Sequence, residues 1–309
     1  MSISVVVATL NGREQLATTL DAITEHAPST EVIVVNGPSS DGTSGMVRGR
    51  TDVDVLVDVD ERNINVARNA GLDRASNDVV AFLEYDVSVE QGWFEAIETH
   101  LIDVRPDDRR ADALTGPTHH RLKAGVTTEQ LETRQICGRD VRYFGGGNVA
   151  VRRDALEALD GFDEALETGG ARDAAHRLAA LGYEVTWAPE MCVRTDLEAD
   201  GGELARDWHR RYRSLVYRLV KNYGLRPTVG VRVLKHSLAD GVGGLRAVLR
   251  GDGRPTAWVG DGRDVLAGVA TGLVDGTVAR TRNGARSQNP NGWTRRTDRA
   301  VRVDDRRRR

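Results

Sequence analysis

Short apolar segments alternate with helical patterns through the N-terminal part of the chain, and this alternation constrains the fold more than any other feature. Each segment is rich in Val, Ile or Leu and too short for a helix, so it is typical of a buried strand. The predicted strands are Ser2–Thr9, Glu31–Val35, Val53–Val59 and Val79–Leu83, with Val53–Val59 at an edge. The pattern predicts an α/β fold with a mostly parallel sheet and helices on both faces.

Polar residues follow three of these strands, where each strand ends. Asn11 follows the first strand, Asn36 the second, and Glu84 and Asp86 the fourth. Right-handed crossovers bring the carboxyl ends of parallel strands to one edge of a sheet. Because open α/β sheets bind ligands outside that edge, the sequence predicts a ligand site there.

Further elements are predicted on both sides of Thr118, beyond which the pattern loosens. A fifth strand begins at Ala113–Thr115, and a late strand covers Tyr183–Trp187. Predicted helices cover Asp154–Leu159, Arg172–Leu181 and roughly Glu203–Tyr223.

The net charge of −3 conceals an uneven distribution. Residues 1–200 contain 36 acidic and 19 basic residues, whereas residues 201–309 contain 10 acidic and 24 basic residues. We therefore predict an α/β domain over 1–200, a basic amphipathic helical extension over 201–280 and a disordered basic tail over 281–309. The basic part suggests an anionic partner such as a membrane surface, a lipid phosphate or nucleic acid.

The sequence lacks the usual marks of export and membrane insertion. No run approaches the roughly 18–20 consecutive apolar residues of a membrane span, and the first residues show no basic segment typical of a signal peptide. Cys137 and Cys192 lack metal-type spacing, so two reduced, buried thiols are expected. These features predict a cytoplasmic protein.

The turn Glu84-Tyr85-Asp86 is the candidate metal site. Mg²⁺ or Mn²⁺ usually takes one or two carboxylates and keeps its other positions for phosphate oxygens and water. Two acidic residues after a buried strand supply such ligands, although a solvated turn would have the same sequence.

Four segments together resemble family-2 glycosyltransferases with the GT-A fold. They are SVVVATLNGREQL, EVIVVNGPSSDGT, NINVARNAGLDRASNDVVAFLEYD and GGGNVAVRRDALEALDGFDEAL, in the family's order and at its separations. The resemblance covers about Ser4–Tyr183 and implies that 1–200 is a GT-A catalytic domain. Within this family, the sequence is similar to archaeal enzymes that assemble lipid-linked N-glycans.

The resemblance implies roles for several of the residues named above. Thr9 and Asn11 would line the nucleotide pocket, and Asn36 stands where the family has an Asp that holds the base or ribose. Arg68, in the Ala-Arg-Asn motif, would approach the diphosphate, or would form a surface salt bridge. Asp86 would bind the metal, and Glu84, in place of the family's first Asp, would assist it or touch the ribose.

The expected catalytic base is missing at the family spacing. Aligning Arg177 with the family Arg puts Ala171 where the family has the Asp that deprotonates the acceptor. Asp173 is the first substitute, or else caps its helix. Glu167 and Asp163 are the others. His176 is expected on a helix surface.

Gly145–Asn148 resembles the family loop over the acceptor site, which makes Gly146 and Asn148 acceptor-side candidates. A plain turn before a strand is the alternative.

The segment DWHRRYRSLVYRLVKNYG interleaves Arg with Trp208, Tyr212 and Tyr217. Basic amphipathic helices of this kind lie on anionic membranes. A solvated structural helix and a nucleic-acid surface are the alternatives, and we expect no nucleic-acid partner.

The expected function is metal-assisted, inverting transfer of a hexose or hexuronic acid from a nucleoside diphosphate sugar. The acceptor would be a glycan on a dolichyl phosphate carrier, in protein N-glycosylation for surface-layer glycoproteins. The enzyme would lie at the inner face of the cell membrane. The alternative is a degenerate, non-catalytic member that binds glycan or lipid. A nucleotidyltransferase is disfavoured because Thr9–Gly12 is too short for its glycine-rich loop.

Overall fold

The computed structural model describes residues 3–103, 111–122, 125–128, 131–195, 207–251, 254–282 and 289–307, with backbone alone for 121, 122 and 125–128. The chain forms two compact units. The first unit comprises Met1–Ala165, Gly170–Gly201 and Asn291–Arg309, and the second comprises Leu166–Gly169 and Gly202–Pro290.

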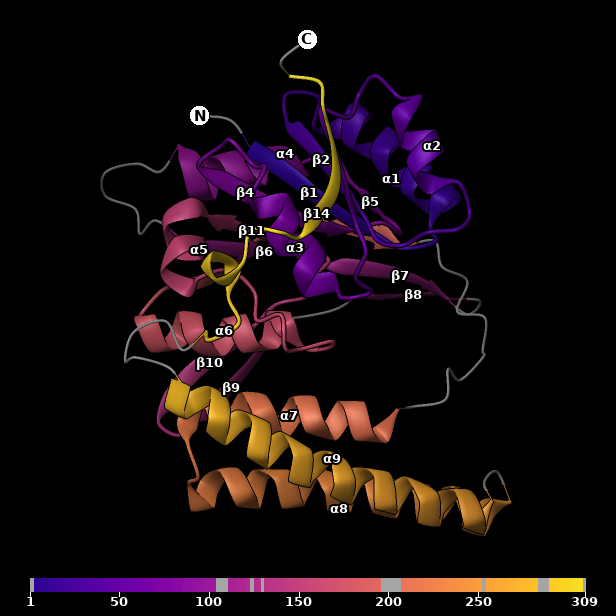
Figure 1. Ribbon diagram of the computed structural model, residues 1–309, viewed down its shortest axis with the longest axis vertical. Helices are drawn as coiled ribbons and strands as arrows, with labels where there is room; N and C mark the ends of the chain where they lie inside the picture. The colour runs from indigo at the N-terminus through magenta and orange to yellow at the C-terminus, as the bar shows by residue number, and fades with distance from the viewer. Residues whose placement is uncertain are drawn as a thin grey trace. The chain divides into compact units, whose positions relative to one another are not determined.

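An eight-stranded sheet forms the centre of the first unit, in the order β12-β6-β11-β4-β1-β2-β3-β14 (Figure 1). The strands β4, β1, β2 and β3 are parallel, whereas β11 and β14 run antiparallel to their neighbours. Their bounds are β1 Ile3–Thr9, β2 Glu31–Asn36, β3 Val55–Val59, β4 Val79–Glu84, β6 Ala113–Thr115, β11 Asn148–Arg152, β12 Val185–Trp187 and β14 Ala300–Asp305.

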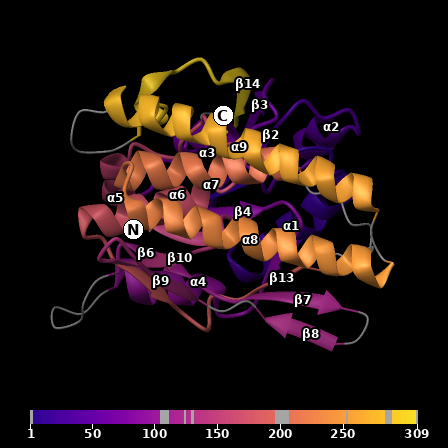
Figure 2. The same ribbon diagram turned by 90° about the horizontal axis from the view of Figure 1, so that it is seen from below.

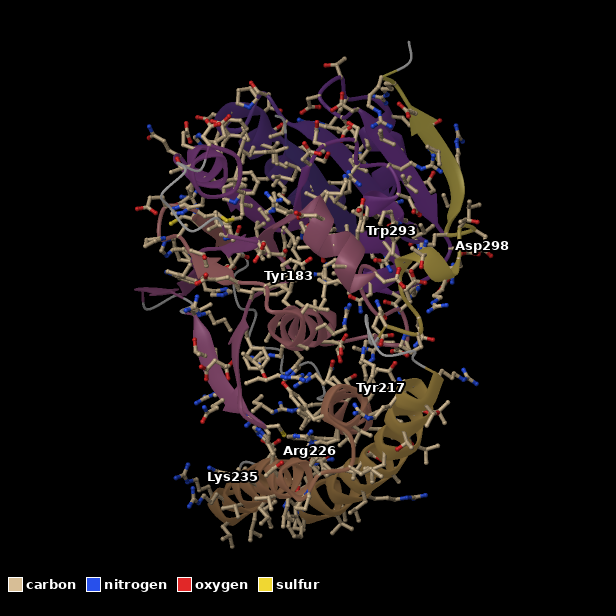
Figure 3. The ribbon with its side chains drawn as sticks, turned by 90° about the vertical axis from the view of Figure 1, so that its left-hand side faces the viewer. Tyr183, Tyr217, Arg226, Lys235, Trp293 and Asp298 are labelled. Carbon is tan, nitrogen blue, oxygen red and sulfur yellow. The ribbon has the colours of Figure 1, made fainter. Side chains whose placement is uncertain are left out.

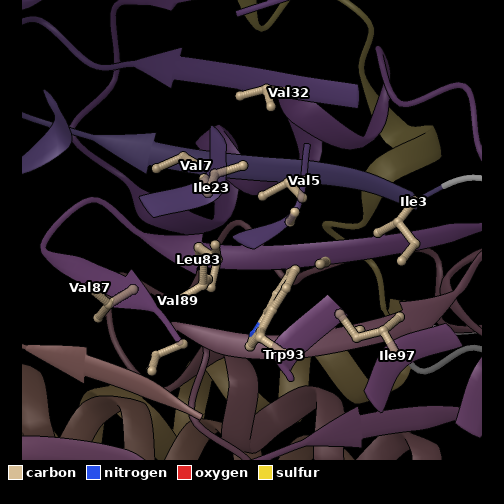
Figure 4. Close-up of a cluster of buried hydrophobic side chains, with 14 of the residues drawn as sticks. Ile3, Val5, Val7, Ile23, Val32, Leu83, Val87, Val89, Trp93 and Ile97 are labelled. Atoms are coloured by element: carbon tan, nitrogen blue, oxygen red, sulfur yellow. The ribbon is translucent and has the colours of Figure 1, made fainter. Parts of the chain in front are cut away.

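Helices cover both faces of this sheet because its central strands are apolar on both sides. One cluster joins Ile3, Val5 and Val7 of β1 to apolar residues of α1 and to Trp93 of α4 (Figure 4). On the other face α3 lies so close that a Cβ at Gly71 would overlap Val6. The helices are α1 Arg13–His26, α2 Thr43–Arg48, α3 Ile64–Leu72, α4 Trp93–Ile97, the π-helix η1 Glu98–Ile102, α5 Arg153–Leu159 and α6 Gly170–Leu181.

Two smaller sheets, neither of them predicted from the sequence, lie in the described part of the first unit. A four-stranded sheet has the order β5-β13-β7-β8, and β9 pairs with β10 in a hairpin. The hairpin turns at Cys137 and Gly138, which both have positive φ, as two-residue turns of this kind require. The bounds are β5 Val87–Val89, β7 Thr118–Leu122, β8 Gly125–Thr128, β9 Glu132–Ile136, β10 Arg139–Tyr143 and β13 Val193–Thr195.

The C-terminal segment is ordered where the structure describes it, so the predicted disorder of 281–309 is wrong for 281–282, which lie in a helix, and for 289–307. The 3₁₀ turn η2 (Trp293–Arg295) precedes β14, which lies antiparallel beside β3 (Figure 2). The predicted edge position of β3 is therefore also wrong. Arginines hold the segment in place: Arg299 pairs with Glu164, Arg307 pairs with Glu31, and Asp304 receives Arg48 at 2.8 Å. Specific ion pairs thus order a stretch whose composition alone is typical of disorder.

The described residues of the second unit form three helices, α7 Trp208–Tyr223, α8 Pro227–Arg250 and α9 Pro255–Arg282 (Figures 1 and 2). α9 packs on α7 through Gly268, Gly272 and Gly276, which are spaced four apart and buried. A Cβ at Gly272 would lie 2.6 Å from the Arg213 carbonyl oxygen and 2.9 Å from Val216 Cβ. None of the described helices is long and apolar enough to cross a membrane.

Replacing Gly272 by Val is expected to destabilise the second unit by about 1–3 kcal/mol, because the added side chain must push the two helices apart. Gly260 offers a matched control on the same helix, since no atom lies within 4 Å of its Cβ position. Gly260→Val should leave stability unchanged or slightly raised. Denaturant unfolding followed by circular dichroism measures both variants, and equal midpoints would contradict this packing.

Candidate functional site

The carboxyl ends of β4, β1 and β2 bring three predicted site residues to one edge of the sheet. In the strand register Ala8 lies opposite Glu84, and Thr9 lies opposite Asn36. Glu84 and Asn36 therefore flank the end of β1 on its two sides. This edge is where open α/β sheets bind ligands.

Arg68 of α3 brings a buried positive charge to the same edge. Its guanidinium donates a hydrogen bond to the Gly146 carbonyl oxygen at 2.8 Å and lies 3.8 Å from Glu84 Oε1. The Phe162 ring packs against it, 5.3 Å from ring centre to Cζ. Burial lowers the pKa of Arg68 to about 10, so the side chain stays charged at neutral pH. The predicted alternative of a surface salt bridge does not fit a side chain that is 6% exposed.

Glycines in the loop before β11 make room for these charges. A Cβ at Gly146 would overlap the Arg68 guanidinium, and one at Gly147 would lie 2.7 Å from Glu84 Cδ. The Gly147 carbonyl oxygen also accepts a hydrogen bond from the Glu84 backbone N–H at 3.3 Å. Gly146 thus has a clear local role, which is to let Arg68 reach the loop backbone.

The turn Glu84-Tyr85-Asp86 is fixed by its central residue. The Tyr85 ring lies on the backbone of Gly12, where a Cβ would overlap it, and the Tyr85 carbonyl oxygen accepts a hydrogen bond from Thr19 Oγ1 of α1 at 2.7 Å. These contacts leave the two acidic side chains at the strand end, and Glu84 is 45% exposed.

Asp86 has the character of a cation ligand. It is half-buried, and within the described part of the chain its carboxylate forms no ion pair. Burial raises its pKa above the usual value, while the backbone N–H of Asp86 and the charge of His120 act in the opposite direction. A half-buried carboxylate that forms no ion pair with a described residue can bind a metal ion, so the residues present fit Mg²⁺ or Mn²⁺.

A chain of hydrogen bonds connects the predicted nucleotide-binding residues. Ser39 Oγ donates to Asn36 Oδ1 and accepts from the Asn11 backbone N–H, at 2.7 and 2.8 Å. Asn36 Nδ2 donates to Ser44 Oγ at 2.7 Å, and Ser44 Oγ donates to Asp58 Oδ1 at 2.6 Å. Asn36 has no carboxylate of its own, but Ser44 links its amide to the carboxylate of Asp58.

Thr9, opposite Asn36 in the strand register, takes no part in this network through its side chain. Its Oγ1 is buried and has no hydrogen-bond partner among the described residues. A buried hydroxyl without a partner carries a desolvation cost that a ligand or a water molecule would relieve.

Asp173, the first predicted substitute for the base, lies in a structural ion pair. Its side chain has no exposed surface, and Arg177 Nε donates to it at 2.8 Å. The guanidinium of Arg177 also binds the carbonyl oxygens of Leu159 and Gly161, which fixes the turn before Phe162. The structure argues against the predicted catalytic role of Asp173, because a fully buried, paired carboxylate cannot reach an acceptor hydroxyl.

The other base candidates also have partners. Glu167 belongs to the second unit, where its exposed carboxylate binds Arg210 at 2.5 Å. Asp163 is buried and accepts a hydrogen bond from the Ala165 backbone N–H at 3.0 Å. His176, expected on a surface, is buried with Nε2 3.2 Å from Tyr143 Oη.

Asn148, predicted on the acceptor side, is instead a buried link. Its Oδ1 accepts from Trp93 Nε1 at 2.9 Å, and its Nδ2 donates to the Met191 carbonyl oxygen at 2.8 Å. A small pocket lies beside it, with Thr115 and Tyr143 in its lining. Asn148 therefore shapes this pocket and has both ends of its amide engaged.

Sequence reasoning missed two features near the site. Strand pairing brings His120 close to Asp86: Thr195 of β13 lies opposite His120 on one side and opposite Val87, the residue after Asp86, on the other. No linear motif indicated that His120 and Asp86 are close. Glu90, His119 and Cys192 also place their ligand atoms within 4.8 Å of one another. Arg194 binds Glu90, and the Cys192 thiol donates to the Pro189 carbonyl oxygen, so protein groups already hold two members of this cluster.

Comparison with known proteins matches this chain to glycosyltransferases. The family model described as glycosyl transferase family 2 matches residues 4–160. Glycosyltransferase AglE of Haloferax volcanii is 27% identical over 200 residues, which cover 61% of this chain and 65% of AglE. The glucosyl-dolichyl phosphate glucuronosyltransferase of the same organism is 27% identical over 182 residues, which cover 53% and 56%. The chain thus spans less than two thirds of the length of these relatives.

A solved structure confirms the predicted fold class. The mannosyltransferase PcManGT from Pyrobaculum calidifontis, in complex with GDP-Man and Mn²⁺, superimposes with a TM-score of 0.55 at 19% identity. The match covers 90% of this chain and 86% of PcManGT. The α/β architecture with a mostly parallel sheet is therefore that of GT-A structures.

Proposed function

Because the chain belongs to glycosyl transferase family 2, we propose that it is an inverting glycosyltransferase that uses a nucleoside diphosphate sugar. One observation carries the proposal: Arg68, Glu84 and the turn to Asp86 meet at the carboxyl edge of the sheet. A positive charge and carboxylates near this edge support the binding of a diphosphate and its cation there.

Asp86 would hold Mg²⁺ or Mn²⁺, with Glu84 assisting it or binding the ribose. When bound, the cation would neutralise the charge that grows on the departing nucleoside diphosphate. The Mn²⁺ named in the PcManGT complex supports this choice of cofactor.

The chain's own residues would do the rest of the binding. Arg68, charged at neutral pH and anchored on Gly146, would attract the diphosphate. Thr9, Asn11 and Asn36 would line the nucleotide pocket, with the buried hydroxyl of Thr9 gaining a partner from the ligand.

The proposed sugar is a hexose or hexuronic acid, and the proposed acceptor is a glycan on dolichyl phosphate. The dolichyl phosphate relative supports this acceptor. The basic composition of residues 201–309 supports work at an anionic membrane surface, at the inner face of the cell membrane. The pathway we propose is N-glycosylation of cell-surface proteins.

Inversion requires a carboxylate on the acceptor side, and Glu167 is the base that we propose. It replaces Asp173, whose burial leaves no route to an acceptor. The same observation favours a second candidate function, a family member that binds glycan or lipid without catalysis. Ala171 at the expected base position points in that direction.

A thermal-shift screen of nucleotide sugars with Mn²⁺, Mg²⁺ or EDTA tests the proposal. A donor at about 100 times its Kd adds roughly 2.7 kcal/mol of stability, which corresponds to a shift of about 5 °C in a protein of this size. We expect the shift for one donor class and its loss in EDTA. No shift with any nucleotide sugar would contradict donor binding, whereas a shift without sugar transfer or donor hydrolysis would support the non-catalytic alternative.

A further inference from the structure

α8 carries a continuous apolar stripe on its exposed side. The stripe consists of Val231, Leu234, Leu238, Val242, Leu245 and Leu249, which are 41–77% exposed. Their spacing of three and four residues places them on one face of the helix. The stripe is about 27 Å long at 1.5 Å per residue. Single exposed apolar residues are ordinary, but a stripe of this length marks an interaction surface.

The opposite face of α8 is the one that packs within the second unit. Val229 is buried there, and Asp240 accepts a hydrogen bond from Tyr212 Oη of α7 at 2.8 Å. Leu238 and Leu249, by contrast, lie roughly half a turn away from these residues. The stripe is therefore turned away from the packed side of its own helix.

Basic residues border the stripe on one side. Lys235 and Arg246 follow Leu234 and Leu245 directly, and Arg232 and Arg250 lie further round the helix. These four form no ion pair with any residue that the structure describes. In Figure 3, Lys235 lies on the side of α8 that is turned away from Tyr217 of α7. Asp240, the single acidic residue between 226 and 250, is engaged by Tyr212 and Arg211.

We propose that this face of α8 binds an anionic membrane surface, with the stripe in the acyl boundary and the basic border at the lipid phosphates. Amphipathic helices with Lys and Arg beside an apolar face bind in this way. The helix would lie in the membrane plane, because no described helix can cross a bilayer. The inference rests on the proposed function for the lipid-linked acceptor that makes membrane contact useful.

The surface differs from the one predicted from the sequence. The predicted membrane helix, α7, has most of its apolar residues buried, among them Tyr212, Val216 and Val220, and Leu215 is half-buried. α8 provides the free apolar face instead.

A second copy of the chain fits this face less well than a membrane. In an antiparallel pairing of two α8 stripes, the basic border of one helix would face the same border of the other, and like charges would repel. Phosphate groups complement the border throughout its length.

Vesicle co-sedimentation of the full-length protein tests the inference. We expect binding to vesicles of phosphatidylcholine mixed with phosphatidylglycerol and little binding to phosphatidylcholine alone. The double variant Leu234→Ser/Leu238→Ser should lower the partition coefficient at least about tenfold, because two apolar side chains no longer enter the bilayer. Lys235→Glu/Arg246→Glu should lower it by a similar factor, and added salt should weaken binding of the unaltered chain.

Val301→Ser is the matched control, since Val301 of β14 is 67% exposed but lies outside the stripe. It should bind vesicles as the unaltered chain does. Equal binding by the leucine variant would overturn the inference, as would a failure of the unaltered chain to bind anionic vesicles. Light scattering that shows a dimer dissociated by the same leucine substitutions would assign the stripe to a second copy and would also overturn it.

The vesicle assay contains neither donor nor metal, so its result is independent of catalysis. Loss of vesicle binding with donor-induced thermal shifts intact would reject the surface and leave the proposed function standing. Intact vesicle binding without any donor-induced thermal shift would reject the proposed function and leave the membrane-binding surface standing.

Discussion

Replacing Asp86 by Asn is expected to reduce sugar transfer by about 10²–10³-fold, the range typical of losing one electrostatic contact to developing charge. The amide keeps the size of the side chain but removes the negative charge that would hold the cation. The metal-dependent part of the thermal shift with nucleotide sugar should disappear as well. Steady-state transfer rates and thermal shifts measure the two effects.

Asp60→Asn is the control for this experiment. Asp60 is an exposed carboxylate directly after β3, another parallel strand of the same sheet, and the structure gives it no partner among the described residues. Its loss should leave transfer within about twofold, as for surface changes generally. Equal effects of the two substitutions would reject the assignment of Asp86.

The raised pKa of Asp86 predicts opposite pH dependences for sugar transfer and for stability. Burial raises its pKa, so protons compete with the cation at a higher pH than for an ordinary Asp. Transfer should therefore fall as the pH drops through this raised value. The sign for stability is opposite: ionisation costs the folded state more than the unfolded chain, so stability decreases as the pH rises through the same window. Asp86→Asn should accordingly be at least as stable as the unaltered chain at neutral pH, although its transfer rate is reduced.

Arg177→Met is expected to destabilise the first unit by about 3–5 kcal/mol, because it leaves a buried carboxylate without its counter-charge. Asp173 and Arg177 are 0% and 1% exposed, so solvent cannot replace the lost partner. Adding Asp173→Asn removes the stranded charge, and the double variant should regain part of the loss. Denaturant unfolding measures all three proteins.

The surface pair of Arg134 and Glu132 provides the comparison. Arg134 is 58% exposed, and Arg134→Met should cost less than about 1 kcal/mol. The same series tests the role of Asp173. If Asp173→Asn alone lowered transfer by about 10²-fold or more without loss of stability, Asp173 would be the base after all.

The central sheet could be predicted from the sequence because each of its strands is marked by a short apolar segment of the chain. Four apolar strands and the polar residues after them predicted which side chains meet, and the register of Thr9 with Asn36 and of Ala8 with Glu84 places them together. The approach of Arg68 to Glu84 was harder to foresee, since it depends on Gly146 and on a strand about eighty residues further along the chain.

The base region shows why motif alignment alone is insufficient. Spacing identified Ala171 at the expected position and made Asp173 the nearest carboxylate. Burial decided the outcome, because Asp173 and Arg177 lie one helical turn apart and pair within the core. The interval of four residues was visible in the sequence, but exposed pairs have the same interval.

The place of β14 in the sheet has a consequence for biosynthesis. β3 receives its outer neighbour from residues 300–305, which a ribosome adds some 240 positions after β3 itself. Until then the nascent chain displays an unprotected row of backbone donors and acceptors, a template for pairing with other chains. Pairing over such a separation is slow, so the growing polypeptide is most prone to aggregate late in translation, when most of its core can already have formed.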